Sequence, residues 1–178
     1  MTNSFFSSIE TWRIPESALV DSMAEMAIDG ISGNEGVALW LGHRRDGIAE
    51  VTHLVALRGA GIIKFPDFLR IEAWLLNDVT DLAIDLELCL IGQIHSHGFG
   101  YPTDLSETDR TFGLAVPYFL TVVAPDYGLR SSIFLPDCGV HIFEPRTGFR
   151  RLDEAEVSQR ILVFPGDRLP LHTVGDGS

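Results

Sequence analysis

Short apolar segments separated by turns constrain the fold of this chain more than any other feature. The run GVALWLG at 36–42 is almost continuously apolar, which is typical of a strand buried on both faces of a sheet. EVTHLVAL at 50–57 follows after the turn HRRDG, and LELCLIGQIHSH at 86–97 is a third such segment. We predict four further short strands, at 118–125, 131–136, 139–145 and 161–165. No segment approaches the ~20 apolar residues of a membrane-spanning helix, so these strands are expected to form the sheet of a globular protein.

Helical patterns alternate with these strands. Residues 14–30 carry an apolar stripe at helical spacing, Pro15 suits the first helical position, and Gly30 ends the pattern. Residues 65–79 have a second amphipathic pattern, which opens with Pro66. Shorter helical segments are predicted at 105–115 and 154–161. Helices mixed with strands in this order predict the α+β class, in a single domain.

Length and charge bound the kind of protein that this chain can be. Its 178 residues suffice for one domain, expected at 13–165, with a loose arm at 1–12 and a flexible tail at 166–178. The net charge of −12 argues against nucleic-acid or anionic-membrane partners, since both require clustered positive charge. Two cysteines are too few for a disulfide framework, and the N-terminus lacks a signal-peptide pattern. We therefore expect a cytoplasmic protein.

The segment HSHGFGYPTDLSETD, residues 95–109, carries the clearest chemical signal. On a strand, residues i and i+2 point to the same face, so His95 and His97 should project side by side. Neutral imidazole is a common zinc ligand. Asp109 is the natural third ligand, since glycines in the intervening loop let the chain fold back toward the strand end. The pattern predicts one zinc ion with three protein ligands and a fourth position for water.

Simpler interpretations of the same residues remain open. Ser106 and Asp109 match the capping box that begins many helices, with the aspartate near the positive end of the helix. Two histidines at a strand end also occur at polar edges that bind no metal. Asp104 becomes an alternative third ligand if the loop follows another path.

The remaining histidines and the cysteines give weaker signals. His53 alternates with valines and is expected to be partly buried in a strand, whereas His43 and His172 are expected at the surface. His141 lies in a predicted strand without an evident partner. Of the cysteines, Cys89 is expected in the core, and Cys138 has no histidine nearby in sequence to activate it as a nucleophile.

The motif HSH…SETD resembles that of the JAB/MPN (JAMM) zinc metalloprotease family, including its prokaryotic members. That family combines a glutamate near an early strand with His-x-His-Pro and then Ser-x-x-Asp. Here GNEGVALWLG supplies Glu35, which alone would pass for a solvated loop residue. The resemblance covers roughly residues 13–145. It departs from the family pattern at Gly98, which replaces the usual proline, and in the spacing from His97 to Ser106, which is one residue longer.

The resemblance implies a fold and a set of residue roles. The expected fold is a mixed, curved β-sheet packed between helices. His95, His97 and Asp109 are implied as the ligands of one Zn²⁺. Glu35 is implied as the general base and acid that carries the water's proton to the leaving amine, and Ser106 as a hydrogen-bond donor to the tetrahedral oxyanion.

The resemblance also implies a substrate class. The expected activity is a zinc-dependent isopeptidase or peptidase that hydrolyses the amide bond after the C-terminus of a ubiquitin-like protein, in deconjugation, precursor maturation or both. Its expected partners are that ubiquitin-like tail and activating and conjugating enzymes, including those of bacterial antiviral operons. Alternatives are a small-peptide or sulfur-carrier-processing peptidase, a non-catalytic MPN scaffold, and a metal phosphoesterase, for which further histidines and carboxylates are missing.

Overall fold

One curled, mixed β-sheet organises the chain. The structure is a computed structural model that describes residues 8–130 and 135–175. The sheet has the strand order β10-β1-β3-β2-β6-β7-β8-β9, and β11 pairs with β3. Its strands are β1 (Thr11–Pro15), β2 (Val37–Arg45), β3 (Ile48–Arg58), β6 (Cys89–Ser96), β7 (Leu120–Ala124), β8 (Gly139–Glu144), β9 (Gly148–Arg151), β10 (Ile161–Phe164) and β11 (Leu171–Gly175). The predicted α+β class and single domain are confirmed.

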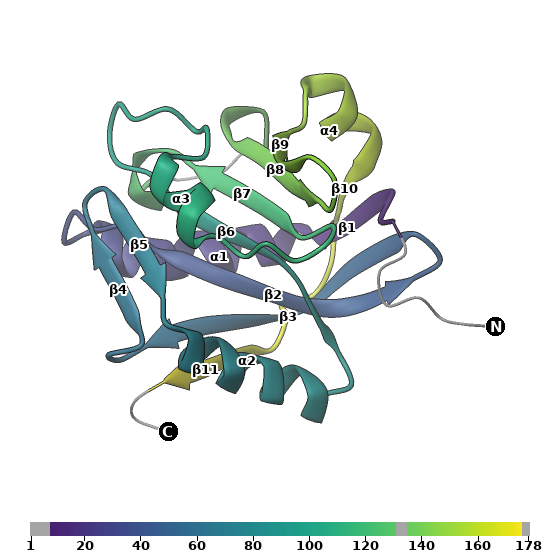
Figure 1. The fold of residues 1–178 in the computed structure, drawn as a ribbon, viewed down its shortest axis with the longest axis horizontal. Helices are drawn as coiled ribbons and strands as arrows, with labels where there is room; N and C mark the ends of the chain where they lie inside the picture. Colours follow the sequence, from purple (N-terminus) through teal and green to yellow (C-terminus); the bar gives the residue numbers. More distant parts are fainter. Residues whose placement is uncertain (1–7, 131–134, 176–178) are drawn as a thin grey trace.

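Helices cover both faces of this sheet (Figure 1). They are α1 (Glu16–Gly30), α2 (Ala73–Asp85), α3 (Glu107–Phe112) and α4 (Glu154–Arg160). On β2, Ala38 and Trp40 belong to the core cluster that includes α1, whereas Val37, Leu39 and Leu41 belong to the cluster with α2. This alternation explains the continuous apolar run, because each face of the strand meets its own helix.

The predicted helix over 65–79 is wrong in its first half. Residues 62–71 form a separate hairpin of β4 (Ile62–Phe65) and β5 (Phe68–Ile71), and α2 begins only at Ala73. Pro66 therefore lies in the hairpin turn, a position that its fixed φ also suits. The apolar residues after Pro66 fit a helical period, but Phe68–Ile71 pair with the strand Ile62–Phe65 instead.

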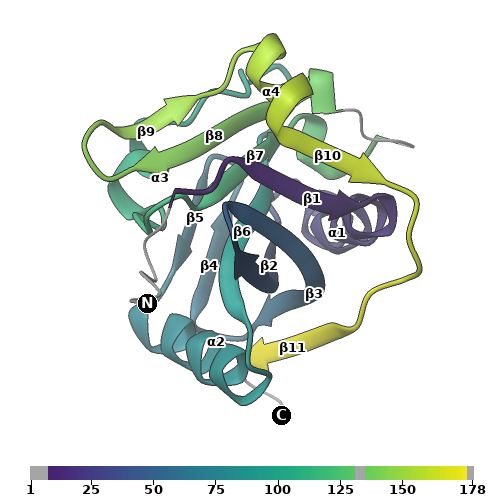
Figure 2. The ribbon, with the colours of Figure 1, turned by 90° about the vertical axis from the view of Figure 1, so that its right-hand side faces the viewer.

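Both chain ends contribute more residues to the sheet than the sequence predicted. The expected loose arm at 1–12 already enters β1 at Thr11, and Ile9 and Trp12 are buried. Within the expected tail at 166–178, β11 pairs in parallel with β3. Figure 2 shows β10 running alongside β1 and β11 lying near α2. These pairings join residues far apart in sequence, so no local pattern predicts them. Residues 1–7 and 176–178 lie outside the described part of the chain.

Smaller differences concern the second half of the chain. The expected strand at 131–136 falls partly on residues 131–134, outside the described residues, and Leu135–Asp137 form a short 3-10 turn. Strand β9 was not predicted, whereas α4 and β10 lie where the sequence placed a helical turn and a last strand. In the part of the chain that the structure describes, no helix has the length and apolar character needed to cross a membrane.

Candidate metal centre

Strand β6 carries two histidines to one end of the sheet. His95 lies within β6, between Val37 on β2 and Val123 on β7, and His97 follows one residue after the strand ends. The backbone N–H of His97 donates to Ala124 O at 2.8 Å, so the chain stays in register past Ser96. The two rings lie on one side with their Nε2 atoms 3.3 Å apart, and both side chains are buried.

Helix α3 brings Asp109 to these rings. Asp109 Oδ1 lies 3.3 Å from His95 Nε2, and Oδ2 lies 3.1 Å from His97 Nε2. Ser106 begins the helix with a full capping box, in which its hydroxyl accepts from Asp109 N at 3.0 Å and its own N–H donates to Asp109 Oδ2 at 2.8 Å. Asp109 therefore takes part in the predicted cap and also lies where the sequence predicted a metal ligand.

The separations of these atoms suit a zinc ion. The three residues offer ligand atoms that all lie within 4.8 Å of one another. A tetrahedral site with ligand distances of ~2.0–2.1 Å requires ligand atoms separated by about 3.3 Å. The 3.3 Å between the two Nε2 atoms matches that requirement, and the carboxylate approaches the rings with a different oxygen each, Oδ1 at 3.3 Å from His95 and Oδ2 at 3.1 Å from His97.

The tautomer of His97 is set by the loop. Its Nδ1 lies 2.7 Å from the carbonyl oxygen of Pro102, which only accepts, so Nδ1 carries the proton and donates it. Nε2 faces Asp109 and His95; it donates to Asp109 when it carries a proton, and a metal would take the place of that proton. Burial alone would raise the pKa of Asp109, but hydrogen bonds from both histidines and from Ser106 hold that pKa well below its ordinary value. Burial alone would lower the pKa of His97, but its hydrogen bonds with Asp109 and with Pro102 O raise it.

Glu35 lies beside this centre, before β2. Its backbone N–H donates to Phe65 O at 3.0 Å, and its side chain is 5% exposed. The pKa of Glu35 is raised to about 8, mainly by burial; His97 lowers it, whereas the carboxylates of Asp109 and Asp67 contribute to the rise. Among the described residues, the metal-ligand group consists of His95, His97 and Asp109 without Glu35. Glu35 is therefore a buried carboxyl of raised pKa beside the three candidate ligands.

Ser96, between the two histidines, was not singled out by the sequence. Its hydroxyl accepts from Gly36 N at 2.9 Å, and its own N–H donates to Gly36 O at 3.0 Å. Gly36 follows Glu35 directly, so this pair fixes the glutamate relative to the histidines. A side chain at Gly36 would come within 2.6 Å of the backbone of Met26, which explains the glycine.

Tyr127 explains the replacement of proline by Gly98. A Cβ on Gly98 would lie 2.6 Å from the Tyr127 hydroxyl oxygen. Tyr127 adopts a positive φ of 55°, its N–H donates to His97 O at 2.7 Å, and its hydroxyl donates to Pro66 O at 3.0 Å. Tyr127 thus ties the end of β6 to the turn of the β4–β5 hairpin. Sequence reasoning missed Tyr127. The glycine at 98, where the family motif has proline, was the one signal that another side chain packs closely against this position.

The other predicted candidates lie outside the ligand cluster. Asp104 pairs with Arg151 at 2.5 Å, and this hydrogen bond holds the pKa of the aspartate below its usual range. Asp104 is thus not brought to the centre as a third ligand. His53 is half-buried as predicted, and its ring stacks on that of His172 with centroids 5.4 Å apart. The expectation of a surface position for His172 is wrong, because β11 carries it onto the sheet.

Three more predictions concern residues of the sheet and of the turn before β8. His43 is exposed, as expected, but lies in β2 and not in a turn. His141 is fully buried in β8. Cys89 is half-buried against the core, and Cys138 is buried, which raises the pKa of its thiol to about 12. Such a thiol is a poor nucleophile, in agreement with the sequence analysis.

Comparison with known proteins finds a likeness in fold. No family model matches the chain. No curated protein matches it either. The solution structure of protein DSY2949 from Desulfitobacterium hafniense resembles it with a TM-score of 0.65 and 13% identity, over 88% of this chain and 94% of that one. At this identity the likeness concerns the fold alone, so the chemistry of the centre has to follow from the residues that compose it.

Proposed function

We propose that this chain is a zinc-dependent isopeptidase or peptidase of the JAB/MPN (JAMM) type. The observation that carries the proposal is the placement of His95, His97 and Asp109 ligand atoms within 4.8 Å of one another, beside the buried Glu35. Helix α1, Glu35, β2, the histidines of β6 and the capped α3 follow one another in the order that the resemblance implies. The mixed, curled sheet with helices on both faces is also compatible with that fold.

The proposed reaction is hydrolysis of an amide bond. Zn²⁺ held by His95, His97 and Asp109 would supply a water of lowered pKa and polarise the scissile carbonyl. Glu35 takes a proton from this water and passes it to the leaving amine. Burial raises the pKa of Glu35, and a carboxyl whose pKa is raised toward neutrality can both accept and return a proton.

Ser106 stabilises the oxyanion of the tetrahedral intermediate in this proposal. Its hydroxyl lies at the exposed start of α3 and donates to Asp109 Oδ2 at 2.8 Å. Rotation about the side-chain bond redirects that proton toward a bound carbonyl, while the backbone N–H of Ser106 still holds Asp109. The residue therefore combines the capping role with a catalytic one.

The β4–β5 hairpin beside the centre supports the proposed substrate class. The β4–β5 hairpin is a separate two-stranded sheet whose turn is bound to Glu35 through Phe65 O and to Tyr127 through Pro66 O. A flexible C-terminal tail binds here by adding main-chain hydrogen bonds to the hairpin, with its final residue at the metal. The tail of a ubiquitin-like protein is such a segment, and activating and conjugating enzymes would supply its conjugates.

A panel of substrates tests the proposal. Zinc-loaded protein is incubated with ubiquitin-like fusions, amide-linked conjugates and unrelated short peptides, and the products are read by intact mass. Release of the modifier after its C-terminal residue, lost in Glu35→Gln, is expected. Equal cleavage of unrelated peptides would favour the small-peptide or sulfur-carrier-processing peptidase. No cleavage by a zinc-loaded protein that binds the modifier would favour the non-catalytic scaffold.

A further inference from the structure

The two histidines of the centre differ in their second ring nitrogen. A histidine that binds a metal almost always donates its other N–H to a carboxylate, a carbonyl or a water, which fixes the tautomer and the ring orientation. His97 meets this requirement through Pro102 O. His95 Nδ1 is buried and has no hydrogen-bonding partner among residues 8–130 and 135–175. Within these residues, the hydrogen bond that a metal-binding histidine makes through its second nitrogen has no direct protein partner at His95.

A second orphaned polar atom lies on the neighbouring strand. Thr121 is 2% exposed, and its Oγ1 also has no partner within the described ranges. In the parallel pairing of β6 and β7, Thr121 is the partner of Gln93, two residues before His95. All three side chains thus point to one face of the sheet. A buried hydroxyl left without a hydrogen-bonding partner is unfavourable, so Thr121 Oγ1 calls for a partner such as a buried water.

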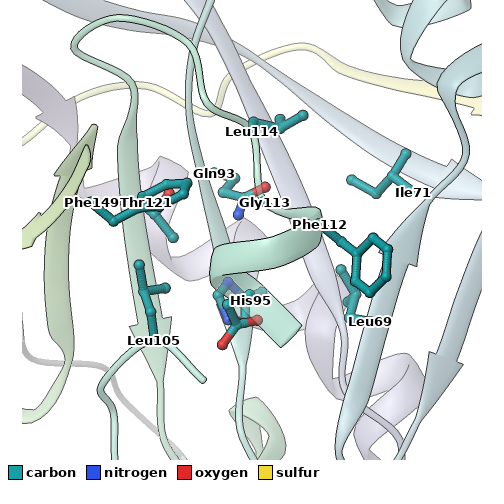
Figure 3. A pocket seen from close by; sticks show the side chains of 11 residues that line it. Leu69, Ile71, Gln93, His95, Leu105, Phe112, Gly113, Leu114, Thr121 and Phe149 are labelled. Carbon is teal, nitrogen blue, oxygen red and sulfur yellow. The ribbon is translucent and has the colours of Figure 1, made fainter. Parts of the chain in front are cut away.

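One small cavity joins these groups. Gln93, His95 and Thr121 line it together with Asp109, and apolar side chains of β5 and α3 flank it (Figure 3). The space open to the centre of a water-sized sphere is about 20 Å³. A buried water needs about 10–15 Å³ measured in this way and two to four polar partners. The cavity therefore fits one water and is too small for a substrate side chain.

We propose that Thr121 is a positioning residue for the metal centre, acting on His95 through one buried water. The water accepts the Nδ1–H of His95 and donates to Thr121 Oγ1, and the amide of Gln93 supplies a further partner. This arrangement fixes the proton on Nδ1 and leaves the Nε2 lone pair for the metal. The inference rests on the proposed metal centre and adds a residue that the family motif does not contain.

The experiment measures zinc affinity, not turnover. Thr121→Val removes the hydroxyl at nearly constant volume, and competition with a chromogenic chelator gives the dissociation constant of zinc for the folded protein. Loss of a hydrogen-bonding partner behind a metal ligand typically weakens binding 10–100-fold, and we expect a loss in this range. Thr121→Ser, which keeps the hydroxyl, should bind nearly as tightly as wild type. Thr80→Val is the matched control, because that hydroxyl bonds only to Leu76 O on the exposed face of α2.

The outcomes separate this inference from the proposed function. Wild-type affinity in Thr121→Val would overturn the role of Thr121 and leave the metal centre intact. Equal zinc binding by wild type and His97→Ala would overturn the metal centre itself, and the inference with it. Should Thr121→Val fail to fold, the Nδ1–H resonance of His95 in wild-type protein decides. A slowly exchanging, protonated Nδ1 is expected, and a His95 protonated only at Nε2 would refute the proposal.

Discussion

Asp109 Oδ2 lies 3.1 Å from His97 Nε2 and at the same time accepts both the N–H and the hydroxyl of Ser106, each at 2.8 Å. One carboxylate oxygen thus belongs to the start of α3 and to the candidate metal centre. Folding of the helix and assembly of the centre are coupled by this shared atom. A substitution that disturbs the cap of α3 should therefore also disturb the metal centre, and a substitution in the centre should also weaken the cap.

The metal centre is tested by zinc content. Protein purified without added metal is expected to contain one zinc ion per chain, because three ligands converge on one point. His95→Ala and His97→Ala should each lose most of the zinc when measured by elemental analysis. His53→Ala is the control, since His53 stacks on His172 outside the ligand group. Full zinc content in both ligand variants would show that the metal, if present, binds elsewhere.

Substitution of Glu35 should reduce turnover without loss of zinc. Glu35→Gln preserves the shape of the side chain and removes the group that exchanges a proton, so zinc content should stay at the wild-type value. Turnover should fall by ~10²–10⁴-fold, the usual contribution of a general acid–base group. Zinc content and rate are measured on one preparation. If the variant loses zinc, Glu35 is a ligand; if it stays active, another residue moves the proton.

Ser106 should show two effects, because it caps α3 and faces the centre. Ser106→Ala is expected to lower the free energy of unfolding by ~0.5–2 kcal/mol through loss of the cap. Its kcat should fall ~10²–10³-fold if the hydroxyl also donates to the oxyanion. Asp153→Ala is the control, since Asp153 begins α4 with the same capping box. Equal losses of stability with unchanged kcat in Ser106→Ala would leave the serine with the capping role alone.

The close approach of Tyr127 to Gly98 predicts that the glycine is required. Gly98→Ala places a Cβ within 2.6 Å of the Tyr127 hydroxyl, which should cost about 1–3 kcal/mol of stability, as overpacking usually does. Urea denaturation measures the change. In a Tyr127→Leu background the same substitution should cost much less, because the hydroxyl and the end of the ring are gone. An equal cost in both backgrounds would mean that the backbone, and not Tyr127, requires the glycine.

Local patterns predicted the central strands and the close approach of the candidate ligands. The apolar run of β2, the i and i+2 placement of His95 and His97, and the cap at Ser106 depend on neighbours within a few residues, and all three lie where they were expected. The pairing of β11 with β3 and of β1 with β10 depends on partners more than a hundred residues away. Such pairings are selected by the burial of whole faces, which a single sequence does not reveal.

Residues whose positions depend on contacts between distant segments were also missed. Tyr127 takes a left-handed conformation that a tyrosine rarely adopts, and it is held there by His97 O and Pro66 O. Thr121 is an ordinary strand residue in sequence, and only the pairing with Gln93 places it near His95. Their importance lies in contacts between segments, whereas the ligands themselves share one short motif.

The burial of His141 predicts a specific loss of stability in acid. Its side chain is fully buried, and burial, with a contribution from Arg151, lowers its pKa from 6.5 to about 4. Between these values the unfolded chain binds a proton that the folded protein does not, so the free energy of unfolding falls as the pH drops from 6.5 to 4. A difference of this size corresponds to about 3 kcal/mol. Above pH 6.5 this group has no effect.

Comparison with His141→Gln isolates this contribution from that of the other titrating groups. Metal-free wild type and variant are unfolded in urea at several pH values between 4 and 7.5, and the difference between their stabilities is plotted against pH. Wild type should lose about 3 kcal/mol more than the variant on going from pH 7.5 to 4. Asp104, whose carboxylate lies 3.9 Å from His141 Nε2, stabilises the protonated ring and acts against this trend. Asp104→Asn should therefore steepen the wild-type loss. A difference that does not change with pH would show that His141 keeps an ordinary pKa in the folded protein.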